Sequence, residues 1–343
     1  RAGKATVTYT GTVGWSNPAL KYYDRLSPKD WTQLNYESLR NKYWDTGSYN
    51  WQEAEQMAKA NLSETMGGER YNPFKNYTWD NIIDENGRVR ENITPAWNED
   101  WLDDGVVHHN AFRQEHLLSV TGGSDKTKAM LSLGYLNEDG YVNNAGYTRF
   151  SARANVDSEI THWLSAGLNV SVAKTDFKGI LSTGNSYGNQ FFYAQLIGPI
   201  YPIYAKDANG QQVYDDLGNK VYDYGDSRPS WPGWNVVGLL YQDDNSQEGM
   251  NESVRTYLRL GTDKDSAGWL KGLKLTANFG GDNRDVYQTH YNNMYNGSYA
   301  DANGRLYKYF KRTTSFTFNQ LLTYNRTFSG HTIDFVGGHE YYK

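Results

Sequence analysis

The chain has 343 residues and a formal net charge of −5, so it carries no basic surplus for binding nucleic acid. It contains no cysteine, which excludes disulfides, thiolate metal sites and cysteine nucleophiles. No stretch reaches the roughly 18 uninterrupted apolar residues of a membrane helix. A transmembrane β-barrel remains possible, because only every second residue of its strands faces lipid.

Nine segments alternate apolar residues with small or polar ones, which is the period of a β-strand with two different faces. In the clearest of them the apolar face carries no charge, as expected of a barrel wall, where a lipid-facing Arg or Lys costs roughly 2–4 kcal/mol. A soluble β-sandwich also segregates its faces, so alternation alone leaves both folds open. The segments are 5–13, 114–122, 128–136, 149–157, 164–172, 253–261, 273–280, 315–325 and 331–337.

The connections favour the barrel. Long excursions at 15–111, 177–250 and 281–313 alternate with short turns such as GGSDK at 122–126. Barrels with short periplasmic turns and long extracellular loops show this rhythm, whereas a Greek-key sandwich does not keep it. We therefore predict an all-β, antiparallel transmembrane barrel whose first strand runs outward. Because bacterial single-chain barrels have an even number of strands and open sheets are not viable in lipid, residues 1–343 are expected to be the first nine or so strands of a larger barrel.

The excursions are predicted to contain local structure. Ser27 as N-cap, with Asp30 completing a capping box, indicates a helix over 27–44. Two further helices are expected over 51–66 and 95–105. Four segments with a D-x-x-G turn are predicted to form small hairpins, at 84–89, 207–213, 215–221 and 301–307.

At this point the sequence resembles a known family, the SusC-like (RagA-like) TonB-dependent transporters of the Bacteroidetes outer membrane. The matching stretches are WNEDWLDD (97–104), HLLSVTGGSDKTKAMLSLGYLNEDGYV (116–142), RFSARANVDSEITHWLSAGLNVSVAKT (149–175) and GPIYPIYAKDANG (198–210). The resemblance implies a 22-stranded barrel around an N-terminal plug, in the outer membrane. It also implies a SusD-like surface lipoprotein as lid and import driven by the TonB–ExbB–ExbD complex. The plug, the TonB box and the C-terminal strands of the family are not found in residues 1–343, so this part is not expected to transport by itself.

Aromatic residues inside the long excursions are the candidate solute-binding residues. Their rings could stack on sugars while Asp and Asn accept hydrogen bonds from hydroxyl groups, although packing within the loops or against the lid is the alternative for each. The segment RPSWPGW (228–234) is the preferred cluster, because two prolines stiffen it and two tryptophans project from it. The aromatic content favours oligosaccharides over peptides as the solute. The candidates are Trp97, Trp101, Tyr187, Tyr193, Trp231, Trp234 and Tyr295.

Four arginines lie on the charged face of their strands and are predicted to line the lumen: Arg149, Arg153, Arg255 and Arg259. They either pair with carboxylates of the plug or provide a polar lining for the solute path. Both interpretations place them away from lipid.

Three other motifs do not predict a catalytic or metal site. GNSYG (184–188) matches the nucleophile-elbow pattern but lies in a Gly/Ser-rich loop without the required strand and helix. Adjacent His108 and His109 point opposite ways in an extended chain, which argues against a shared metal. The stretch 242–252 is rich in Asp and Asn but lacks the calcium-loop spacing, so a solvated loop is expected. We therefore expect no catalytic residue, metal or cofactor.

Three functions remain open at this stage. The first is the barrel of a TonB-dependent nutrient importer, with oligosaccharides favoured and peptides possible. The second is an outer-membrane surface receptor or adhesin barrel without active transport. A plug and TonB box upstream in the parent gene would favour the importer over the adhesin. The third is a soluble carbohydrate-binding β-protein or glycosidase, which extraction in plain buffer without detergent would support.

Overall fold

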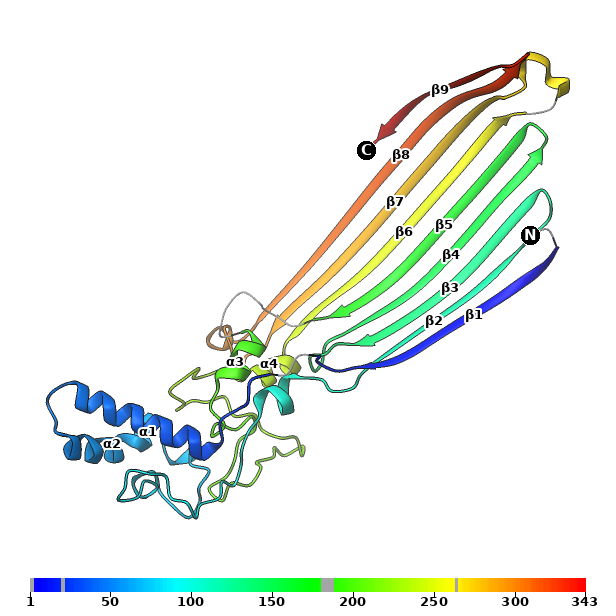
Figure 1. The fold of residues 1–343 in the computed structure, drawn as a ribbon. Coiled ribbons are helices and arrows are strands. Elements are labelled where there is room, and N and C mark those ends of the chain that lie inside the picture. The colour runs from blue at the N-terminus through cyan, green and yellow to red at the C-terminus, as the bar shows by residue number, and fades with distance from the viewer. Residues whose placement is uncertain (1–2, 20–21, 180–187, 263–264) are drawn as a thin grey trace.

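The described residues of the computed structural model, 3–19, 22–179, 188–262 and 265–343, form one antiparallel sheet with a packed unit of loops and helices at one end (Figure 1). The strands follow one another in chain order, and each pairs with its sequence neighbours. Every one of the nine segments predicted to be a strand is a strand. They are β1 (Gly3–Ser16), β2 (Ala111–Gly123), β3 (Thr127–Asp139), β4 (Gly146–Thr161), β5 (Leu164–Lys178), β6 (Asp244–Gly261), β7 (Leu273–Asn292), β8 (Arg305–Phe328) and β9 (His331–Tyr342).

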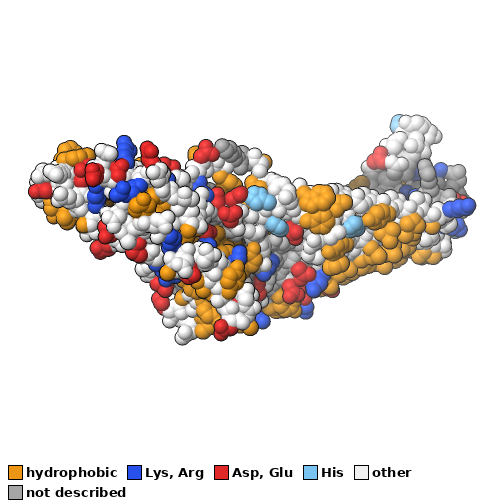
Figure 2. Space-filling view, turned by 90° about the horizontal axis from the view of Figure 1, so that it is seen from below, with side chains coloured by type: hydrophobic (Ala, Val, Ile, Leu, Met, Phe, Trp, Pro, Cys, Tyr) orange, Lys and Arg blue, Asp and Glu red, His pale blue; other side chains and the backbone are white. Residues whose placement is uncertain are grey.

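The strand register carries the alternation across the whole sheet, so that its two faces differ. Residues paired in register on one face, the apolar face, form a continuous row: Val7, Val120, Leu131, Ala154, Val170 and Val254. On the opposite, polar face the next row is Ser119, Ser132, Arg153, Ser171, Ser253 and Asp282. The apolar side chains are not packed in a protein core, since Leu131 is 49% exposed and Leu168 is 47% exposed. Figure 2 shows hydrophobic side chains gathered along the strands.

Strands β7 and β8 continue well beyond the apolar band. They have 20 and 24 residues, so β8 extends over roughly 80 Å, whereas a membrane strand needs about 10 residues. On the apolar face, polar pairs mark where the band ends. Arg312 donates two hydrogen bonds to Asp285, at 2.6 and 2.5 Å. Beside this pair, Thr314 donates to Asn283 at 3.0 Å, and Asn283 donates to Glu252 at 3.3 Å.

The two longest connections, 17–110 and 179–243, pack together at the same end of the sheet (Figure 1). Side chains from both contribute to one hydrophobic core, which explains why these long segments are compact. Core residues that are at most 1% exposed include Tyr36, Leu62, Trp79, Trp101, Tyr193, Ile200 and Val236.

Two helices of the first connection lie where the sequence predicts them, α1 (Pro28–Asp45) and α2 (Trp51–Thr65). The predicted capping box of α1 is wrong. The Ser27 hydroxyl oxygen accepts a hydrogen bond from the backbone N–H of Asp30 at 3.1 Å. The Asp30 carboxylate, however, accepts from the Ser27 hydroxyl and not from the Ser27 backbone N–H, as a capping box requires. A complete box caps α2, where Asn50 and Glu53 each bind the other's backbone N–H.

The other local predictions are partly correct. Instead of a helix over 95–105, only a π-helical turn, η3 (Trp101–Val106), forms after Asp100. Three of the four small hairpins form, at 84–89, 207–213 and 215–221, while 301–307 is a 3₁₀ turn that leads into β8. Two short helices were not predicted: α3 (Gln190–Leu196) and α4 (Val236–Gln242). Among the described residues, no helix is both long and apolar enough to cross a membrane.

Candidate functional site

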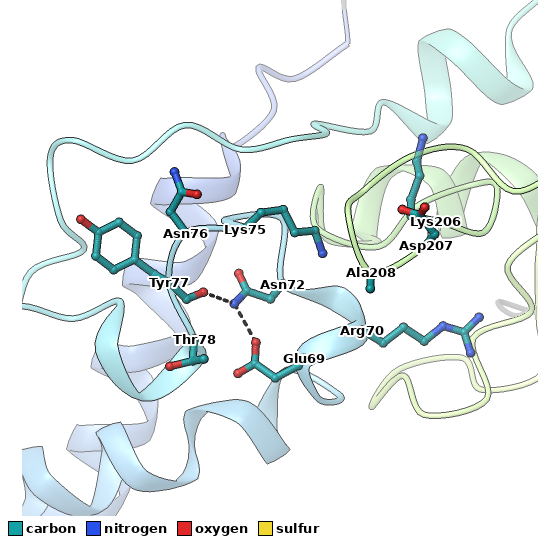
Figure 3. Close-up of a pocket in the computed structure, with 10 residues that line it drawn as sticks. All are labelled: Glu69, Arg70, Asn72, Lys75, Asn76, Tyr77, Thr78, Lys206, Asp207 and Ala208. Atoms are coloured by element: carbon teal, nitrogen blue, oxygen red, sulfur yellow. Dashed lines mark hydrogen bonds between the residues drawn. The ribbon is translucent and has the colours of Figure 1, made fainter.

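A pocket of about 510 Å³ opens between the two long connections and is the candidate binding site (Figure 3). We refer to it as the loop pocket. Its volume lies within the range of about 300–1,000 Å³ typical of small-molecule sites. It is lined by Glu69, Arg70, Asn72, Lys75, Asn76, Tyr77, Thr78, Lys206, Asp207 and Ala208.

Side-chain hydrogen bonds to the backbone hold the first wall of the loop pocket in shape. Glu69 accepts from the backbone N–H of Trp79 and from the Asn72 amide, both at 2.8 Å. Asn72 in turn accepts from the N–H of Phe74 at 2.9 Å and donates to the carbonyl of Tyr77 at 2.6 Å. Asn72 is buried, so these bonds fix the turn that presents the residues between Phe74 and Thr78 to the pocket.

The second wall is the tip of a small hairpin. Asp207 Oδ1 accepts from the backbone N–H groups of Asn209 and Gln211, both at 2.8 Å, which is an Asx-type turn. Its Oδ2 has no hydrogen-bond partner within the described parts of the chain and is an acceptor available to a ligand. The carboxylate is exposed.

Two of the three cations of the loop pocket are already paired. Arg70 donates to Asp223 at 2.7 Å, and Asp223 is fully buried. Lys206 lies 3.6 Å from Glu99, and both side chains are largely buried. These pairs hold the two connections together and leave little charge for a ligand.

Lys75 is the cation that remains available. Among the described residues its ammonium has no carboxylate within ion-pair distance, and it lies 4.6 Å from the ring centre of Trp97. Partial burial lowers the pKa of Lys75 below its usual value. Figure 3 shows its side chain extending toward the loop of Asp207 and Ala208.

The loop pocket therefore presents donors, acceptors and an aromatic ring together. Lys75 and Asn76 can donate, Asp207 can accept, and Tyr77 supplies a half-buried ring at the rim. This mixture suits a ligand with many hydroxyl groups. The sequence does not single out these residues, because the two walls are about 130 positions apart in the chain. Only the D-x-x-G turn at 207–210 carries a local signal.

Three of the aromatic candidates, Trp97, Trp101 and Tyr193, belong to the core instead of a surface. Trp101 is 1% exposed and donates its indole N–H to the Tyr201 carbonyl at 2.8 Å, and Trp97 donates likewise to Ile200 at 2.8 Å. Tyr193 is fully buried, with its ring centre 5.2 Å from that of Trp101. In this arrangement they stabilise the loops by packing, which is the alternative role given for each of them, and their contact with a solute stays a prediction.

The segment 228–234 is organised by a buried arginine. Arg228 is 2% exposed and donates to the carbonyls of Ser230 at 2.9 Å, of Trp231 at 2.8 Å and of Trp234. Both tryptophans are partly buried against the core. The sequence predicts that two prolines stiffen this segment, and the three carbonyls that accept from one guanidinium constrain it further.

Of the remaining candidates, Tyr295 is 60% exposed and stays available for a solute or a partner. Tyr187 lies outside the described residues, as does most of the GNSYG motif at 184–188.

The four predicted lumen arginines all lie on the polar face: Arg149, Arg153, Arg255 and Arg259. Two of them pair with carboxylates of the same wall. Arg149 lies 3.3 Å from Glu115, and Arg255 lies 2.6 Å from Asp282. Arg153 has no ion pair within the described ranges. Carboxylates of the wall itself thus pair with two of the four arginines, in place of the plug carboxylates predicted as their partners.

The structure gives other roles to the histidines and to the acidic stretch. His109 pairs with Asp103 at 2.8 Å, and His108 lies 3.1 Å from the Gly140 carbonyl. Within the described residues, no group of three or more His, Cys, Asp or Glu side chains could hold a metal ion. The prediction of a solvated loop over 242–252 is wrong for most of its length, because β6 begins at Asp244.

Comparison with known proteins identifies relatives of this sheet and its loops. The chain is 25% identical to TonB-dependent receptor P3 of Formosa agariphila over 252 residues, 72% of this chain and 23% of that protein. It is 24% identical to TonB-dependent receptor SusC of Bacteroides thetaiotaomicron over 285 residues, 81% of this chain and 26% of that protein. The predicted resemblance to SusC-like TonB-dependent receptors is confirmed. No family model matches the chain.

Solved structures agree on the fold of the chain. The RagAB peptide transporter superposes with a TM-score of 0.65 at 21% identity, covering 98% of this chain and 34% of that one. The RagAB peptide importer in its closed-closed state gives 0.64 at 19% identity, covering 100% and 35%. The predicted fold, a partial transmembrane β-barrel, and the predicted outer-membrane location are confirmed. The apolar face is therefore the lipid-facing one, and the chain spans about a quarter of the length of its curated relatives.

Proposed function

We propose that this chain forms part of the wall and the extracellular loops of a TonB-dependent importer that takes up oligosaccharides. The observation that carries the proposal is the continuous uncharged band on the apolar face of the strands, together with the similarity to TonB-dependent receptors. In this proposal the connections 15–111 and 177–250 lie outside the cell, and solute capture needs no covalent chemistry.

The loop pocket supports an oligosaccharide as solute. A sugar ring offers hydroxyl groups that both donate and accept, and an apolar face that can pack on an aromatic ring. Lys75, Asn76 and Asp207 match the first property, and Tyr77 matches the second. A peptide is the second candidate, since the structures with the same fold are described as a peptide transporter and a peptide importer.

The proposal includes partners that residues 1–343 do not contain. A SusD-like surface lipoprotein would cover the loops, where Tyr295 is exposed to meet it. TonB–ExbB–ExbD would act through a segment outside this sequence. The alternative, a surface receptor or adhesin without transport, would bind the same solutes but would not deplete them from the medium.

The test uses the full-length protein in detergent, with a panel of oligosaccharides and, separately, a panel of short peptides. Lys75→Ala removes a charged donor, which contributes about 1.5–3 kcal/mol, so sugar binding is expected to weaken roughly tenfold or more by calorimetry. Lys42→Ala, at an exposed position near the end of α1, is the matched control and should bind as the parent does. Equal sugar affinities of Lys75→Ala and the parent would show that the loop pocket is not the binding site. Binding of peptides but not of sugars would show that the solute is a peptide.

A further inference from the structure

A groove of about 540 Å³ lies on the lipid-facing side of β1 to β6, away from the loops and from the polar face. We refer to it as the wall groove. Ala152 pairs in register with Leu133 on one side and Val172 on the other, and its single methyl group leaves a depression between these larger side chains. Tyr135 and Phe150 line the same groove, and their ring centres are 4.8 Å apart.

A row of rings marks the level of the wall groove in the membrane. Tyr9 hydrogen bonds to His116 at 2.7 Å, His116 stacks on Tyr135 with centres 6.3 Å apart, and Tyr135 packs on Phe150. Rings with polar atoms of this kind gather where hydrocarbon meets headgroups. The row lies near the end of the sheet that carries the long connections. In the orientation proposed above, this end is in the outer leaflet.

Lys174 of β5 lies beside the last ring of this row, Phe150 of β4. Lys174 pairs in register with Phe150, lines the wall groove and is 54% exposed. Its contacts with Asp176 at 3.7 Å and Glu248 at 3.8 Å are longer than the 2.7–2.9 Å of strong charged hydrogen bonds. The ammonium has three N–H donors and two carboxylate neighbours, so one donor remains for the headgroup of a lipid.

We propose that the wall groove binds one acyl chain of an outer-leaflet lipid, with the lipid phosphate beside Lys174. The groove is continuous with the surface that already contacts lipid, and it is apolar apart from its rim, so an acyl chain is the occupant that its chemistry fits. Leaving the bilayer for the groove gives no hydrophobic gain, since lipid tails are as apolar as leucine. Selective retention depends instead on close contacts with a rigid surface and on the phosphate.

Native mass spectrometry of the full-length protein, released from nanodiscs of phosphatidylethanolamine and phosphatidylglycerol, tests this proposal. Ala152→Phe fills the wall groove, and loss of the lipid-bound peak is expected. Ala154→Phe, two residues along the same face of β4 but outside the groove, is the matched control and should keep that peak. Lys174→Gln should lower the retained phosphatidylglycerol while leaving the apolar part of the groove intact.

Heat-modifiable gel mobility establishes that each variant is a folded barrel before lipids are counted. Equal lipid retention in Ala152→Phe and Ala154→Phe would overturn the proposal. Unchanged retention in Lys174→Gln would overturn the assignment of the phosphate. The experiment reports on the lipid-facing surface alone, so its outcome is independent of which solute the loops bind.

Discussion

Asp223 shows how individual charged residues hold the two long connections together. The side chain is completely buried and accepts hydrogen bonds from Arg70 at 2.7 Å and from the backbone N–H of Gly225 at 3.1 Å. Burial raises the pKa of Asp223, and the attraction of Arg70 only partly offsets it. The ion pair therefore joins the two connections at a cost in desolvation.

Because the pKa of Asp223 is raised, the stability of the loops is expected to depend on pH. A carboxyl group with a raised pKa in the folded state stabilises fully below its unfolded pKa of about 3.9, and that contribution is lost as pH rises through the folded value. Asp223→Asn removes this titration. The melting temperature of the loops, followed by near-ultraviolet circular dichroism from pH 4 upward, should therefore fall less steeply with pH in Asp223→Asn than in the parent. Parallel curves would contradict the assignment.

At the scale of elements, the capping box of α2 gives the next prediction. Asn50 accepts from the Glu53 N–H at 3.0 Å, and the Glu53 carboxylate accepts from the Asn50 N–H at 2.8 Å. Loss of an N-cap side chain costs about 1 kcal/mol, so Asn50→Ala should lower loop stability in urea by that amount. Gln52→Ala, exposed in the same turn, should leave it unchanged or slightly higher. Equal losses in both variants would show that the box is not the cause.

The same elements show what the sequence could predict. Alternation located each strand found in the described part of the chain, because lipid and lumen impose the same period on a strand that crosses the bilayer. The extensions of β7 and β8 carry weaker alternation, so the sequence predicted only their membrane parts, 273–280 and 315–325. Helices α3 and α4 have seven residues each, too few for a helical period to stand out.

The loop pocket could not be predicted for a different reason. Its walls come from hairpins and turns whose approach depends on buried long-range contacts, such as the pair of Arg70 with Asp223. Single residues do not reveal the pocket either, since Trp101 and Tyr193 are conspicuous in the sequence and are buried in the core. A local sequence pattern predicts which side of a segment is buried. A site formed between two segments depends on how those segments pack against each other.

For the whole molecule, the arrangement of the two faces around the bilayer makes the strongest prediction. Leu131 lies in the middle of the lipid-facing row, between Val120 and Ala154, so Leu131→Arg in the full-length protein should cost roughly 2–4 kcal/mol of folding free energy in lipid vesicles. Ser119→Arg lies at a neighbouring position on the polar face, where water can solvate the charge, and should cost much less. Urea titrations of both variants in the same vesicles measure the difference. If the two substitutions destabilised the barrel equally, lipid would not be what the uncharged face contacts, and the outer-membrane importer would lose its physical basis.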